Sequence, residues 1–158
     1  MKGFTLVELL ITVAVLAAVA AVAGINLFGY YSRQNLELTT EEFIALIRDA
    51  QNRSLTQQDG NADGQGDQWG IHFENAATTQ DFGRLFFGSS YASSTAAATN
   101  ILRTGIQFTD PGPGTSKDVI FSKVTGLPDV SVTVIISLTG DSSASSTIYI
   151  NENGRIQY

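Results

Sequence analysis

The sequence has no cysteine, and only one of its 158 residues is a histidine. Without cysteine the chain can form no disulfide framework and no thiolate metal site, and it has no cysteine nucleophile. The single histidine, His72, can supply neither a catalytic triad nor a multi-histidine metal centre by itself. It lies in an alternating segment, which predicts an ordinary strand residue on the less buried face.

Positive charge is also sparse, with nine lysine and arginine residues against fifteen aspartate and glutamate residues and a net charge of −6. The basic residues are scattered singly along the chain, so no phosphate-binding cluster is visible, and nucleic acid is not expected as a partner. The segment Gly112–Lys117 lacks the glycine directly before lysine that a P-loop requires, so it predicts a loop between strands. These absences favour a protein that is not an enzyme.

The sequence has a long apolar run near its start. Residues 4–28 carry one charge, Glu8. As a helix with a rise of about 1.5 Å per residue, the run is about 37 Å long and exceeds the ~30 Å of bilayer hydrocarbon. We therefore expect residues 4–28 to form a transmembrane helix. A carboxylate inside such a span is costly unless it is paired, so Glu8 requires a partner.

The residues around Glu8 suggest that partner. The segment Gly3-Phe4-Thr5-Leu6-Val7-Glu8, preceded by Met1-Lys2, resembles the class III signal of type IV prepilins and type II secretion pseudopilins. The resemblance implies that residues 1–3 are a leader peptide, which a prepilin peptidase removes by cleavage after Gly3. It also implies N-methylation of Phe4. Glu8 would neutralise the N-terminal amine during assembly, when residues 4–28 become the filament core.

Two other fates of the apolar run remain open. Ala21-Val22-Ala23 before Gly24 has the small-x-small form that an ordinary signal peptidase accepts, which would release a soluble domain. The run could also be a plain, uncut anchor. Neither alternative gives Glu8 a partner.

The helix is predicted to continue through residues 29–57 as an amphipathic half. Apolar residues recur there at helical spacings, whereas acidic and basic residues occupy the other faces. No proline occurs before Pro111, so none interrupts the helix. The predicted buried face consists of Leu36, Phe43, Leu46, Ile47 and Ala50.

Residues 58–158 change to a two-residue alternation that predicts an antiparallel β domain of two small sheets. The expected strands are 69–73, 84–87, 101–108, 118–124, 130–138, 147–152 and 155–158. Asn153-Gly154 predicts a type I′ turn that places Tyr149 opposite Tyr158 and Glu152 opposite Arg155. The polar stretches 89–100 and 140–146 are expected to be exposed loops.

One long helix before consecutive strands predicts an α+β chain, and the resemblance specifies a pilin-like fold with a β-sandwich-like domain. Trp69-Gly70-Ile71-His72-Phe73 and Ile148-Tyr149-Ile150-Asn151 resemble motifs of minor pseudopilins of the GspH/FimT type. Many major pilins carry a disulfide-closed loop, so the absence of cysteine also favours a minor subunit.

The segment from Asp59 to Asp67 is a candidate calcium loop. Oxygen ligands recur at loop positions one, three, five and nine, with glycine at position six. Position twelve is Gly70 rather than the expected acid. The alternative is a solvated Asp/Asn/Gly turn without an ion. The candidate ligands are Asp59, Asn61, Asp63, Gln65 and Asp67.

Together these patterns predict a membrane-anchored minor pilin or pseudopilin of a type IV pilus or type II secretion-like filament. The resemblance implies as partners the prepilin peptidase, other pilin or pseudopilin subunits, the inner-membrane assembly platform and membrane lipid. It also implies a single-pass inner-membrane protein with an extracytoplasmic β domain that later enters a filament. The alternative is a surface binding module, an adhesin or DNA-uptake minor pilin, that uses a pilin anchor.

Overall fold

The computed structural model describes residues 3–158, apart from the side chains of residues 22–28 and 93. The chain divides into two compact units, Met1–Gln34 and Asn35–Tyr158. One long helix contributes to both units, and all of the strands belong to the second. The elements are α1 (Leu6–Leu55), β1 (Trp69–Glu74), β2 (Phe82–Phe87), the 3-10 helix η1 (Tyr91–Ser93), β3 (Thr95–Ile101), β4 (Ile106–Asp110), β5 (Ser116–Phe121), β6 (Val132–Leu138), β7 (Asp141–Ile150) and β8 (Ile156–Gln157).

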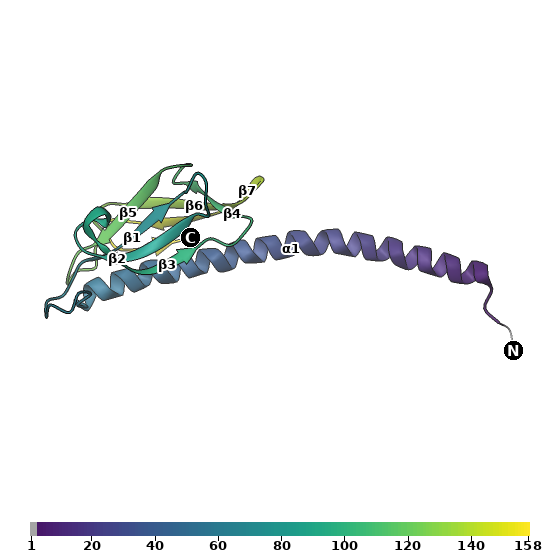
Figure 1. The fold of residues 1–158 in the computed structure, drawn as a ribbon, viewed down its shortest axis with the longest axis horizontal. Coiled ribbons are helices and arrows are strands. Elements are labelled where there is room, and N and C mark those ends of the chain that lie inside the picture. The colour runs from purple at the N-terminus through teal and green to yellow at the C-terminus, as the bar shows by residue number, and fades with distance from the viewer. Residues whose placement is uncertain (1–2) are drawn as a thin grey trace. The chain divides into compact units, whose positions relative to one another are not determined.

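The strands form two four-stranded antiparallel sheets, in the orders β3-β2-β1-β5 and β4-β6-β7-β8 (Figure 1). The expected fold, one long helix followed by antiparallel sheets, is confirmed. Within the second unit, the C-terminal part of α1 contributes an apolar face to the core that it shares with both sheets.

The predicted buried face of α1 is largely confirmed. Phe43, Ile47 and Ala50 are completely buried. Ile44 is also buried, although the sequence analysis did not place it on this face, whereas Leu46 is only partly buried. The aromatic ring of Phe43 packs against Phe73 of one sheet and Phe108 of the other, with centroid distances of 6.2 and 5.5 Å.

The end of α1 is capped by its own backbone. Gln57 takes a left-handed conformation with φ of 52°, its N–H donates to the Ser54 carbonyl, and the Gln58 N–H donates to the Arg53 carbonyl. These two bonds form a Schellman motif, which satisfies carbonyls that the helix leaves unpaired. Glycine usually takes this position, so the helix end lacks its commonest sequence signal.

The buried hydroxyl of Ser54 links α1 to the first sheet. Its Oγ accepts a hydrogen bond from the Trp69 N–H at 2.8 Å and donates to the Phe121 carbonyl at 3.0 Å. Because Trp69 begins β1 and Phe121 ends β5, one side chain fixes the helix against two strands.

The predicted strand 101–108 is wrong, because this segment belongs to two strands in different sheets. β3 ends at Ile101, and β4 begins at Ile106. Between them the Ile106 N–H donates to the Arg103 carbonyl, and Gly105 has a positive φ of 86°. Apolar alternation does not reveal that the chain leaves one sheet and enters the other.

The predicted loops 89–100 and 140–146 are also wrong in large part. Thr95–Ile101 forms β3, and Asp141–Ile150 forms β7. Most of β3 and the first half of β7 are solvent-exposed on both faces, so their side chains show no apolar alternation. Backbone pairing with β2 and β6 makes these segments strands.

The last hairpin forms with a different turn from the one predicted. Tyr149 pairs with Gln157 and Ile150 with Ile156, so the register differs by one residue from the predicted Tyr149–Tyr158 pair. Gly154 has a positive φ of 79°, whereas Asn153 does not take the left-handed conformation that a type I′ turn requires. The Gly154 N–H donates to Asn151, and the Asn151 N–H donates to Arg155. A longer turn that ends in a glycine bulge accounts for the shift.

We expect Phe43→Ala to destabilise the second unit by about 3–5 kcal/mol, because it removes a fully buried ring and leaves a cavity. Urea unfolding followed by the fluorescence of Trp69, the only tryptophan, measures this change. Leu38→Ala is the matched control on the same helix, because Leu38 is 40% exposed. Equal losses in the two variants would contradict a core centred on Phe43.

Candidate functional site

The start of α1 places Glu8 against the backbone that precedes the helix. Oε2 of Glu8 accepts hydrogen bonds from the Thr5 N–H at 3.0 Å and from the Thr5 hydroxyl at 2.9 Å. The Thr5 hydroxyl in turn accepts from the Glu8 N–H at 3.3 Å. This reciprocal pattern is a capping box, which stabilises the first turn of a helix. Thr5 is therefore a local partner of Glu8. The sequence analysis did not predict this contact, although the spacing Thr-x-x-Glu is typical of a capping box.

The predicted cleavage site precedes this cap. Gly3 and Phe4 lie outside the helix and are exposed, and the Phe4 side chain is 78% accessible. No atom beyond its chain neighbours lies within 4 Å of the position that a Cβ on Gly3 would take. Both residues are therefore exposed in the described chain. Met1 and Lys2 of the predicted leader lie outside the described residues.

The apolar side chains after Glu8 are open to solvent. Their exposed fractions range from 56% at Ile11 to 68% at Leu16. None of these side chains contributes to the core of the second unit. The exposed set consists of Leu9, Leu10, Ile11, Val13, Val15, Leu16 and Val19.

Within the part of the chain that the structure describes, no helix has the length and hydropathy needed to cross a bilayer.

The candidate calcium loop is organised around Asp59 by backbone hydrogen bonds. One carboxylate oxygen accepts the N–H groups of Asn61, Ala62 and Asp63, and the other accepts the Gly64 N–H at 2.7 Å. The Gly64 N–H, more than any other group, lowers the pKa of Asp59 below its ordinary value. An ion would have to compete with these donors for both oxygens.

Three of the other candidate ligands, Asn61, Asp63 and Asp67, also accept backbone N–H groups of the loop. Asp67 accepts the Gly60 N–H at 2.9 Å, and Asp63 accepts the Gln65 N–H at 2.8 Å. Among the residues that the structure describes, no group of three or more His, Cys, Asp or Glu side chains is placed to hold a metal ion. These contacts favour the alternative, an Asx-turn loop without an ion, and a calcium titration decides between the two.

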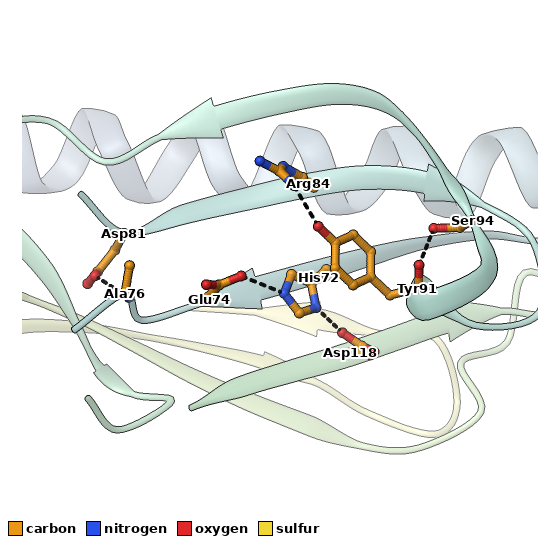
Figure 2. Close-up of polar contacts among 8 residues, drawn as sticks. All are labelled: His72, Glu74, Ala76, Asp81, Arg84, Tyr91, Ser94 and Asp118. Carbon is orange, nitrogen blue, oxygen red and sulfur yellow. Dashed lines mark hydrogen bonds and ion pairs between the residues drawn. The ribbon is translucent and has the colours of Figure 1, made fainter. Parts of the chain in front are cut away.

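His72 alternates with the core residues Ile71 and Phe73 along β1 and lies outside the hydrophobic core. The sequence did not predict that His72 is buried, with its ring stacked on Tyr91 of η1 at a centroid distance of 3.7 Å. Its Nδ1 lies 2.5 Å from Asp118 Oδ1, and its Nε2 lies 3.2 Å from Glu74 Oε2. Figure 2 shows the ring between the two carboxylates, with Arg84 donating to the Tyr91 hydroxyl.

The contacts of this cluster connect neighbouring strands and are typical of a structural role. Arg84 of β2 and Asp118 of β5 are the strand partners of His72, so the network joins three strands and η1. No serine, threonine or cysteine takes part in these contacts as a nucleophile. The sequence could not reveal the cluster, because only strand register brings positions 72, 84 and 118 together.

A long helix whose C-terminal part packs on two antiparallel sheets is the arrangement of a pilin fold. Residues 1–24 match the family described as the prokaryotic N-terminal methylation motif. This match and the fold support the resemblance to the type IV pilin-like superfamily.

Among solved structures, the chain is similar to the type IV minor pilin FimU of Pseudomonas aeruginosa. The identity is 16% and the TM-score 0.57, and the similarity covers 81% of this chain and 90% of that chain. This likeness confirms the pilin fold. No curated protein matches the sequence significantly.

We expect the midpoint of thermal unfolding to be the same in excess calcium and in excess chelator, because backbone donors already occupy Asp59. A bound ion at about 100 times its Kd would add about 2.7 kcal/mol and raise the midpoint by several degrees. Such a rise, abolished by Asp63→Ala, would support the calcium loop instead.

We expect Asp59→Ala to lower the unfolding midpoint at pH 7 and to have less effect in acid. Because the folded pKa of Asp59 is lowered, its contribution is fully present above the unfolded pKa of about 3.9. It is lost as the pH falls through the folded pKa. Thermal melts between pH 7 and pH 2 test this, with Glu152→Ala as the control. If the unfolding midpoints of wild type and Asp59→Ala differed as much at pH 2 as at pH 7, this prediction would be contradicted.

Proposed function

We propose that the protein is a membrane-anchored minor pilin subunit of a type IV pilus or type II secretion-like filament, of the GspH/FimT type. In this proposal a prepilin peptidase cleaves after Gly3 and methylates Phe4, and the inner-membrane platform then assembles the subunit with other pilins or pseudopilins. The N-terminal motif and the pilin fold support a minor pilin. The role is structural rather than catalytic.

The observation that carries the proposal is the direction of the Glu8 carboxylate. Glu8 Oε2 accepts the Thr5 N–H, so it faces the N-terminal end of α1 rather than the side of the helix. Cleavage after Gly3 turns the nitrogen of Phe4, the residue next to Thr5, into a free amine. Adjacent Cα atoms are about 3.8 Å apart, so the new cation arises within one residue of a group that Glu8 already binds. An ion pair there removes the cost of two unpaired charges in an apolar environment.

The exposed apolar side chains indicate what surrounds this charge pair. Burying one such side chain is worth roughly 1.5–3 kcal/mol, so the set from Leu6 to Val19 favours lipid before assembly and neighbouring helices afterwards. The proposed span, residues 4–28, includes residues 22–28, whose side chains lie outside the description. The second unit has its own core, and in this proposal it folds on the extracytoplasmic side.

We expect N-terminal mass spectrometry to find methylated Phe4 when the full chain is expressed in membranes with a prepilin peptidase. A start at Gly24, or an intact Met1, would contradict the proposal. The wild-type chain without the peptidase is the control for cleavage.

We expect Glu8→Gln to be cleaved but to enter filaments at least about tenfold less well, because an unpaired amine in an apolar bundle costs more than 1.4 kcal/mol. Immunoblots of sheared filaments measure incorporation. Glu37→Gln, an exposed change on the same helix, is the matched control. Equal incorporation of Glu8→Gln and wild type would contradict the charge-pairing step.

A further inference from the structure

Two exposed tyrosines follow the apolar run. Tyr30 is 64% exposed and Tyr31 is 52% exposed, and their rings meet edge to face with centroids 6.1 Å apart. They begin two residues after Phe28, the last residue of the run, and the cation Arg33 follows them. The first buried core residue on α1 is Leu36, so neither ring belongs to the core of the second unit.

The spacing along α1 matches a bilayer. Residues 9–28 form a stretch of twenty residues without charge, which spans about 30 Å as a helix. Glu8 lies immediately before this stretch, and Tyr30 and Tyr31 lie just after it. This stretch of sequence, which includes residues 22–28 whose side chains lie outside the description, is long enough to place Glu8 near one surface of the hydrocarbon and the tyrosines near the other.

The side chains at the far end suit the headgroup layer. A tyrosine ring is apolar along its body and polar at its hydroxyl, which is why tyrosine is enriched where hydrocarbon meets water. Arg33 is exposed and forms no ion pair with any described residue, so its guanidinium can bind lipid phosphate. Glu37, one turn further on, is exposed and anionic, which favours water over phosphate.

We propose that Tyr30, Tyr31 and Arg33 form a headgroup collar, which binds the phospholipid headgroups of the extracytoplasmic leaflet and sets the depth of the unassembled subunit. The inference rests on the proposed membrane span. It adds the lipid group that the helix binds and the depth at which the helix lies in the bilayer. The collar holds Glu8 at the opposite surface, where the carboxylate stays hydrated until assembly. It thereby lowers the cost of an acid in the span before its pairing with the Phe4 amine.

The absence of cysteine makes the collar directly testable, because a single introduced cysteine is a unique labelling site. Gly29→Cys places a spin label beside the collar without replacing a tyrosine. Apart from its chain neighbours and the adjacent helix backbone, no described atom lies within 4 Å of the Cβ that it adds. The full chain is reconstituted in vesicles of phosphatidylcholine and phosphatidylglycerol. Power saturation with oxygen and with a water-soluble nickel complex then reports the depth of the label. Val15→Cys is the reference for the hydrocarbon and Leu38→Cys the reference for water.

We expect the Val15 label to lie deep, the Gly29 label at the headgroup boundary and the Leu38 label in water. Replacing both tyrosines, Tyr30→Ser with Tyr31→Ser, should move the Gly29 label by about 3 Å or more, the rise of two helical residues. Tyr149→Ser, which removes a 48% exposed ring from β7, should leave the depth unchanged. With Arg33→Gln, the depth of the Gly29 label should change less when the fraction of phosphatidylglycerol in the vesicles is varied.

The outcomes separate this inference from the proposed function. A deep Val15 label combined with a Gly29 label that ignores both tyrosines would overturn the collar and leave the span intact. If the depth of the Gly29 label were unchanged and the double tyrosine variant failed to enter filaments, the rings would belong to a contact between subunits. This combination also overturns the collar. A Val15 label in water would overturn the membrane span itself.

Discussion

The packing of Phe43 between the two sheets is the contact on which the second unit depends. Its ring is completely buried and meets Phe73 of β1 and Phe108 of β4, so helix and both sheets share one aromatic centre. Gly83 on β2 must lack a side chain, because a Cβ there would overlap the Phe43 ring. Neither sheet has a helix of its own to cover its inner face. The amphipathic face of α1 therefore provides what a two-layer domain requires.

The same helix has two different chemical surroundings along its length. From Leu36 onward its apolar side chains are buried by protein, whereas those between Leu6 and Val19 are exposed in the single chain. Contact with lipid or with another apolar surface would bury this second set. The second unit thus has a core of its own, whereas the apolar side chains between Leu6 and Val19 are exposed.

Polar residues with suggestive spacing are largely satisfied by the fold itself. The carboxylate of Asp59 organises its own loop through backbone donors, and His72 is enclosed by Asp118, Glu74 and Tyr91. In both arrangements the carboxylate oxygens and ring nitrogens already have hydrogen-bond partners within the fold. Glu8 differs, because its present partner is a backbone group beside the predicted cleavage point. Processing would place a charge there.

Local signals in the sequence determined the helix, its buried face and the position of the candidate processing site, because each depends on residues within one or two turns of one another. The capping box at Thr5 and Glu8 was equally local and could have been predicted. Only the tertiary structure decided the assignment of residues 95–101 and 141–146 to strands, the break between Ile101 and Ile106, and the burial of His72. Exposed strands carry no apolar alternation, and their identity comes from backbone bonds to distant partners. The neighbours of His72 are likewise set by register, since Arg84 and Asp118 meet it only after three strands have paired.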